Sequence, residues 1–123
     1  MPIDDLVDAY CACWADMDSE QRLVRLTTVF AENGFYHDPT VQISGLKAFE
    51  KHIASVVTQR PGSIIERTTG IDLHHNTARF GWNLKLADGK KLPEGIDIIW
   101  LDQSEEKITG ILGFFGPLKP IER

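Results

Sequence analysis

The chain has 123 residues, a length that predicts one domain with one core over residues 1–123. Hydrophobic residues make up 42% and charged residues 25%, the usual balance of a globular protein. The net charge is −5 and the lysines and arginines are scattered, which argues against a nucleic-acid-binding surface.

No apolar run approaches the roughly 20 residues that a membrane span needs. The acidic N-terminal stretch MPIDDLVD lacks the basic region of a signal peptide. Cys11 and Cys13 lie two residues apart, and on a helix they would point in different directions, so they are not expected to pair. We therefore expect a reduced, cytoplasmic protein that binds neither nucleic acid nor a membrane.

Apolar residues at helical spacing predict three helices in the first half of the chain. Each helix has recognisable start or stop signals, namely polar capping residues, Asn-Gly and Pro-Gly. The expected helices cover residues 3–17, then run from Asp18 or Ser19 to the ENG stretch at 32–34, and then from Ser44 or Gly45 to the RPG stretch at 60–62.

In the second half of the chain, the spacing of apolar residues changes from about 3.6 to 2, which predicts strands. Asp88–Gly89 marks a hairpin connection between two of them. The expected strands are a short one at 35–38 between two helices, then 63–74 with a bend at Gly70, 77–87, 96–101 and 107–115. This order predicts an α+β fold in which the helices pack on one face of a curved antiparallel sheet.

Asp38 stands at the end of a strand-forming stretch and is followed by Pro39. If residues 36–38 are extended, Tyr36 and Asp38 point to the same side. A carboxylate beside aromatic surface loses hydration, so its pKa is expected to rise, and it then serves as a general base near neutral pH. The alternative is an Asp-Pro turn in which Asp38 accepts hydrogen bonds from the backbone amides of residues 40 or 41.

Asp97 lies within GIDIIWL, a strand that is otherwise apolar on both sides. A buried carboxyl group there would have to be paired, metal-bound or protonated, and a protonated carboxyl donates a hydrogen bond. The alternative is a hydrated carboxylate, or one paired with Lys90 or Lys91. Tyr10, on the core face of the first helix, is either a hydrogen-bond donor in a pocket or an ordinary core tyrosine.

Several aromatic residues could line a pocket, although each could equally belong to the core. His52 borders the inner face of the third helix and could reach a cavity, or could be a boundary histidine. The four histidines show no metal-binding spacing, and no nucleotide-binding or serine-hydrolase motif occurs, so we expect neither metal nor cofactor. The candidate pocket residues are Trp14, Tyr36, His52, Phe80, Trp82, Trp100 and Phe114.

Three segments resemble the SnoaL-like, nuclear-transport-factor-2-like superfamily: VFAENGFYHDP, GLKAFEKHI and ITGILGFFGPL. The resemblance extends over nearly the whole chain. It implies a cone-shaped, cystatin-like α+β fold in which three N-terminal helices pack on a strongly curved antiparallel sheet around an apolar cavity. It also implies a homodimer formed through the sheet.

Within this superfamily the chain is similar to ketosteroid isomerase at three positions. The resemblance implies that Asp38, in the DP segment, is a general base. It also implies that Tyr10 in DAYCACW and a neutral Asp97 in GIDIIW donate hydrogen bonds to an oxyanion. The residues after Asp97 differ from the isomerase pattern, and Tyr36 and Trp14 add bulk near the expected mouth, which argues against a steroid substrate.

Two functions remain open at this point. The first is a cofactor-independent enzyme, of the isomerase or polyketide-cyclase type, that transfers protons on a small apolar carbonyl compound. The second is a non-catalytic dimeric module that binds a small hydrophobic ligand or a protein partner. The fold alone does not decide between them.

Overall fold

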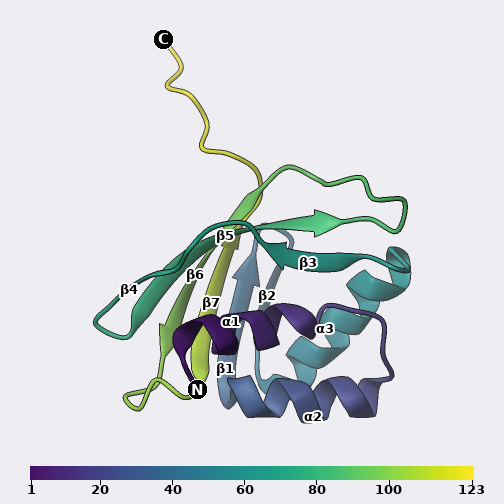
Figure 1. Cartoon of the computed structure of the whole chain (residues 1–123), viewed down its shortest axis with the longest axis vertical. Helices are drawn as coiled ribbons and strands as arrows, with labels where there is room; N and C mark the ends of the chain where they lie inside the picture. Colours follow the sequence, from purple (N-terminus) through teal and green to yellow (C-terminus); the bar gives the residue numbers. More distant parts are fainter.

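A computed structural model describes residues 1–123, and Figure 1 shows its helices gathered on one side of a curved sheet. The helices are α1 (Ile3–Ala12), α2 (Ser19–Val29) and α3 (Leu46–Gln59). The strands are β1 (Phe30–Asp38), β2 (Val41–Ser44), β3 (Ile64–Arg67), β4 (Asp72–His74), β5 (Thr77–Lys85), β6 (Gly95–Leu101) and β7 (Ile108–Phe114).

The strands pair in the order β2-β1-β7-β6-β5-β3, and β4 also pairs with β5. Twenty buried residues from the three helices, the α1–α2 connection and the inner face of the sheet form a hydrophobic cluster. The expected α+β fold with helices on a curved sheet is confirmed. One pairing differs from the expectation: β1 runs parallel to β7, so the sheet is mixed rather than wholly antiparallel. None of the helices has both the length and the apolar character needed to cross a membrane.

The second helix begins as predicted but ends earlier. Asp18 is its N-cap and accepts a hydrogen bond from the Gln21 backbone amide at 2.7 Å. The expected stop at residues 32–34 is wrong, because the helix ends at Val29 and the ENG stretch lies inside β1. Gly34 allows the ring of Phe30 to lie against the backbone, since a Cβ there would sit 2.7 Å from Phe30 Cζ.

The strand prediction also needs correction at two places. The short strand expected at 35–38 is the end of the nine-residue β1, and it forms a hairpin with β2 that the sequence analysis missed. The single bent strand expected at 63–74 is two strands, β3 and β4, interrupted around Gly70. The third helix does start after Gly45, whose φ of 99° favours glycine, and it ends before the RPG stretch as predicted.

The first helix ends at Ala12, so the prediction of a helix to residue 17 is wrong. The reason is Arg22, whose side chain is only 2% exposed. Its guanidinium donates hydrogen bonds to the backbone carbonyls of Cys13 (3.0 Å), Ala15 (2.9 Å) and Met17 (3.3 Å). These carbonyls are satisfied without further helical turns, and the segment that carries Trp14 is held against α2.

Glu50 of α3 completes this buried site, with its Oε2 atom 3.1 Å from Nη1 of Arg22. Removing one partner of a buried ion pair leaves the other charge uncompensated. We expect Arg22→Met to lower the free energy of unfolding by about 3–5 kcal/mol, measured by urea denaturation. Arg25→Met, on the exposed side of the same helix, is the control and should change it by less than about 0.5 kcal/mol.

Arg22→Met combined with Glu50→Leu should recover part of the loss, because no buried charge then lacks a partner. Equal stability of Arg22→Met and the wild type would contradict this account of the α1–α2 connection.

Candidate functional site

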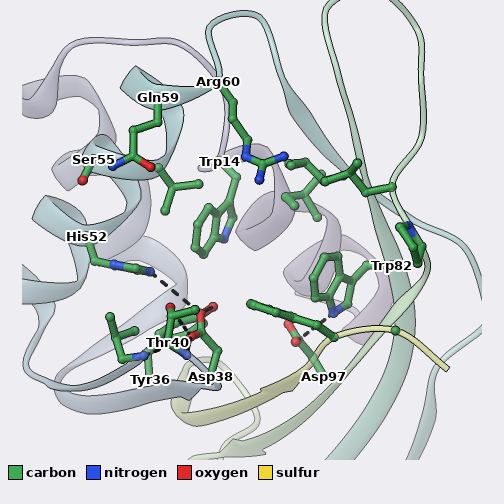
Figure 2. Close-up of a pocket in the computed structure, with 18 of the residues that line it drawn as sticks. Trp14, Tyr36, Asp38, Thr40, His52, Ser55, Gln59, Arg60, Trp82 and Asp97 are labelled. Carbon is green, nitrogen blue, oxygen red and sulfur yellow. Dashed lines mark hydrogen bonds and ion pairs between the residues drawn. The ribbon is translucent and has the colours of Figure 1, made fainter. Parts of the chain in front are cut away.

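A cavity of about 710 Å³ opens between the helices and the inner face of the sheet. Its size is that of a small-molecule site. Figure 2 shows Asp38 and Asp97 at one end of this cavity and Arg60 at the other. Ten of its 19 lining residues are hydrophobic. The lining includes seven residues singled out from the sequence: Tyr10, Trp14, Tyr36, Asp38, His52, Trp82 and Asp97.

Three of the expected pocket residues lie elsewhere. Phe80 is 2% exposed and belongs to the core cluster rather than to the cavity wall. Trp100 lies on the outer face of the sheet, because it alternates along β6 with the inward-facing residues. Its ring packs against Phe35, with centroids 5.8 Å apart. Phe114 is 54% exposed, and the next residue, Phe115, lines the cavity in its place.

Asp38 is the last residue of β1, and its two carboxylate oxygens have different surroundings. Oδ1 accepts hydrogen bonds from the Thr40 backbone amide (2.7 Å), the Thr40 hydroxyl (2.7 Å) and the Val41 amide (3.2 Å). Oδ2 accepts a hydrogen bond from the Tyr36 hydroxyl at 2.6 Å and lies 3.9 Å from Nε2 of His52. The turn interpretation and the pocket interpretation are therefore both observed, one on each oxygen.

The pKa of Asp38 is lowered, which corrects the expectation that it would rise. Burial pulls this pKa upward, since the side chain is only 4% exposed. The hydrogen bonds from Tyr36 and Thr40, together with the nearby His52, stabilise the ionised form and outweigh burial. Asp38 is therefore ionised at neutral pH.

Aromatic rings surround the Asp38 end of the cavity. Trp14 packs edge-on against His52, with centroids 6.1 Å apart, and Tyr36 stacks on Phe49 at 4.5 Å. Trp14 and Tyr36 are 7% and 5% exposed, so they form an inner wall rather than the mouth that the sequence suggested. Burial lowers the pKa of His52, against the opposing effect of Asp38, which favours the neutral imidazole.

Asp97 is in the middle of β6 and is 6% exposed. Its Oδ1 accepts a hydrogen bond from Nε1 of Trp82 at 2.9 Å. No lysine pairs with Asp97, and Lys91 lies near Glu66 instead, at 4.0 Å. Burial raises the pKa of Asp97 to about 7, with the charge of Asp38 acting in the same direction and the Trp82 hydrogen bond opposing it. The protonated form is therefore well populated near neutral pH.

Gly113 of β7 lies between the two carboxyl groups. It is paired with Asp97 in the sheet register, and the adjacent residue Leu112 is paired with His37 of β1. A Cβ at Gly113 would lie 3.1 Å from Oδ1 of Asp97 and 3.5 Å from Cβ of Asp38. The two acids thus flank a single residue that has no side chain, and even a methyl group at this position would be in tight contact with Asp97.

Tyr10 projects from α1 and is 2% exposed. Burial raises the pKa of its hydroxyl well above the ordinary value, and the charge of Asp97 acts in the same direction. The phenol therefore remains protonated and able to donate a hydrogen bond. Tyr10, Asp38 and Asp97 line the same cavity, but their roles in any reaction remain predictions.

Several further lining residues lie in a row on α3 and were not predicted from the sequence. Ser55, Val56 and Gln59 follow His52 at intervals of three, four and seven residues, so they share one helix face. Arg60 follows directly, and Thr40 comes from the β1–β2 turn. The helical period was a usable signal for the α3 row, because His52 was already a candidate.

The raised pKa of Asp97 has a consequence for stability. The folded protein binds the Asp97 proton more tightly than the unfolded chain does, so the stability that this group contributes is fully present below about pH 4 and is lost as the pH rises to about 7. Asp97→Asn cannot ionise. The wild type should therefore lose a few kcal/mol of unfolding free energy between pH 4 and pH 8 that Asp97→Asn does not lose. Urea denaturation of both proteins at the two pH values measures this difference.

The exposed residue Asp5 supplies the control, since Asp5→Asn should show little change in the same comparison. A pH-independent difference between Asp97→Asn and the wild type would show that Asp97 has an ordinary pKa.

No protein-family model matches the chain, and no curated protein matches it. Its structure is similar to that of a candidate isomerase of the SnoaL-like family from Agrobacterium tumefaciens. The TM-score is 0.84 with 28% sequence identity, over 92% of this chain and 96% of that one.

Two further similarities concern the fold. A protein from Catenulispora acidiphila with a ketosteroid isomerase-like fold, solved with trimethylamine, has a TM-score of 0.71 and 14% identity over 90% of this chain and 85% of that one. A candidate polyketide cyclase from Sinorhizobium meliloti has a TM-score of 0.70 and 13% identity over 92% of this chain and 94% of that one. Together with the element order and the curved sheet, these similarities show that the chain has the fold of the SnoaL-like and ketosteroid isomerase-like proteins.

Proposed function

We propose that this protein is a cofactor-independent enzyme that removes a proton from the carbon next to a carbonyl group of a small apolar compound. The observation that carries the proposal is the unequal state of the two acids that flank Gly113. Asp38 has a lowered pKa and is ionised, whereas Asp97 has a pKa of about 7 and retains its proton more readily. One acid is thus suited to accept a proton and the other to donate a hydrogen bond.

In the proposed reaction, Oδ2 of Asp38 takes the proton from the α carbon. The electron pair of the broken C–H bond forms a carbon–carbon double bond, and the carbonyl oxygen becomes an enolate oxygen. The hydroxyl of Tyr10 and the carboxyl of Asp97 donate hydrogen bonds to this oxygen. Oδ1 of Asp38 stays bonded to Thr40 and Val41, which fixes the orientation of the carboxylate.

The fate of the enolate decides the overall reaction. If Asp38 returns its proton to a different carbon, the result is an isomerisation. If the enolate carbon attacks a second carbonyl group, the new carbon–carbon bond closes a ring, and the resulting alkoxide takes up a proton. The candidate isomerase and candidate cyclase among the similar structures support both outcomes.

Because Asp38 is a weaker base than an unpaired buried carboxylate, the proposed rate depends strongly on stabilisation of the enolate. We expect Asp38→Asn to lower the rate of hydrogen–deuterium exchange at the α carbon of 2-tetralone by at least ~10²-fold, followed by NMR in D₂O. Asp72→Asn, at an exposed position that does not line the cavity, is the control and should exchange at the wild-type rate.

Measuring both binding and exchange of 2-tetralone distinguishes the enzyme from the non-catalytic binding module. Binding of 2-tetralone, followed by quenching of the tryptophan fluorescence, should persist in Asp38→Asn. The wild-type rate should fall as the pH rises above about 7, where Asp97 ionises, and Asp97→Asn should lose this alkaline limb because its amide remains a donor. Binding without any exchange in the wild type would instead support the non-catalytic module.

We also propose that a second copy of the chain covers the outer face of the sheet. The outer face carries three aromatic residues that alternate with the inward-facing residues of their strands, namely Phe35, Trp100 and Phe114. Phe114 is 54% exposed. Apolar side chains gathered on an outer sheet face are typical of an interaction surface. Residues of β1, β6 and β7 contribute to it, and Ile98 and Leu112 are paired at its centre.

We expect the wild type to sediment as a dimer and Trp100→Glu to sediment as a monomer with an unchanged circular dichroism spectrum, because the new charge would be desolvated in the interface. Arg25→Glu reverses a charge on an exposed residue of α2, which packs on the opposite face of the sheet, and serves as the control. A monomeric wild type at high micromolar concentration would overturn the proposed dimer.

A further inference from the structure

The upper rim of the cavity has a polar character that the proposed proton transfer does not use. Ser55 and Gln59 lie on the same face of α3, and Arg60 follows at its end. All three are exposed and line the cavity. Figure 2 shows their side chains at the edge opposite to Asp38 and Asp97, with the guanidinium of Arg60 directed into the space beside Trp14.

Arg60 has no ionic partner in the protein. The arginines that form ion pairs are Arg22, Arg67 and Arg79, each with a carboxylate about 3 Å away. Arg60 is absent from these pairs, although the chain is acidic overall, with 18 Asp and Glu residues against 13 Lys and Arg residues. It is also the only lysine or arginine among the 19 residues that line the cavity. An unpaired guanidinium at a cavity mouth is well suited to bind an anionic group of a ligand.

The opposite end of the cavity repels an anion. Asp38 is ionised there, and its charge already disfavours ionisation of the neighbouring Asp97. An anionic group of a ligand would therefore be pushed away from Asp38 and attracted to Arg60. The two ends thus define one orientation for an elongated ligand.

Much of the remaining cavity lining is apolar and includes Ile65, Leu84, Leu92 and Phe115. A ligand that spans the cavity would therefore have a hydrophobic middle section, and a cavity of about 710 Å³ has room for a small amphiphile with groups at both ends.

We propose that the cavity takes an amphiphilic organic anion, an apolar carbonyl compound that carries a carboxylate, with the carboxylate at Arg60, Gln59 and Ser55 and the carbonyl group between Asp38 and Asp97. The placement of the carbonyl rests on the proposed function. The contact between Arg60 and the anionic group does not depend on any chemical step, so it is tested separately by equilibrium binding.

The test compares two fluorescent probes with the same aromatic skeleton. 8-Anilinonaphthalene-1-sulfonate carries an anionic group, whereas N-phenyl-1-naphthylamine lacks it. Arg60→Gln should weaken binding of the sulfonate about 3- to 10-fold and leave binding of the neutral probe unchanged, because only the charged contact is lost. Arg60→Lys should retain most of the affinity for the sulfonate, since it keeps a positive charge.

Lys51→Gln is the matched control, because Lys51 is an exposed cation on α3 that does not line the cavity. It should leave both affinities unchanged, and 2-tetralone should displace both probes if they occupy the cavity. Equal affinities of Arg60→Gln and the wild type for the sulfonate would overturn the proposal. So would an equal loss for both probes, failure of 2-tetralone to displace the sulfonate, or no sulfonate binding to the wild type.

These results are independent of the exchange assay. Loss of α-carbon exchange with a retained difference between the probes would reject the proton transfer and keep the ligand class. Exchange of 2-tetralone without a difference between the probes would keep the proton transfer and reject the anionic ligand.

Discussion

The candidate site depends on one electrostatic constraint: two carboxyl groups on strands that flank β7 are buried near each other with too few donors for both to ionise. The hydrogen-bond donors are unevenly divided between the two carboxyl groups. Asp38 receives hydrogen bonds from Tyr36, Thr40 and Val41, whereas the only side-chain donor to Asp97 is the indole of Trp82. Burial is the main reason that Asp97 tends to stay neutral, and the charge of Asp38 adds to it, so the pair consists of one carboxylate and one carboxyl group that readily keeps its proton.

The surrounding fold maintains the different protonation states of Asp38 and Asp97. Three of the four donors to Asp38 come from its own β1–β2 turn or from the preceding residues of β1, so its ionised state is fixed locally. The state of Asp97 has a different origin, since it depends on exclusion of water by the helices and the aromatic wall. Arg22 contributes to this exclusion at a distance, because it holds the turn that places Trp14 over the cavity.

Local patterns in the sequence predicted much of this arrangement. The GIDIIWL stretch indicated a carboxyl group inside an apolar strand, and the Asp38–Pro39 pair indicated a turn, because both signals depend on near neighbours. The expectation that Asp38 and Asp97 face a shared cavity came from the resemblance to the superfamily. The strand at residues 30–34 was mistaken for a helix end, because Asn33–Gly34 is a common stop signal. The pairing of Phe30 and Phe35 with β7, on either side of an irregular stretch, places this segment in the sheet instead.

The features that escaped prediction are those that depend on long-range contacts. Nothing close to Arg22 in sequence indicates that it would bond three carbonyls of the preceding turn and Glu50, 28 residues away. The lowered pKa of Asp38 was missed for a similar reason: its apolar neighbours were visible, but the number of hydrogen bonds to it was not. Trp100 and Phe114 were assigned to the pocket because their strands are apolar on both sides, which hides the face that each residue takes.

The most direct measurement of the central claim is a ¹³C NMR titration of the aspartate side-chain carboxyl carbons, with Asp38→Asn and Asp97→Asn used to assign the two signals. The account predicts that Asp97 titrates near pH 7 and that Asp38 titrates below the ordinary value of an aspartate. In Asp38→Asn the titration of Asp97 should move to lower pH, because the repelling charge is gone. Ordinary titration of both carboxyl groups near pH 4, with neither affected by loss of the other, would contradict the account.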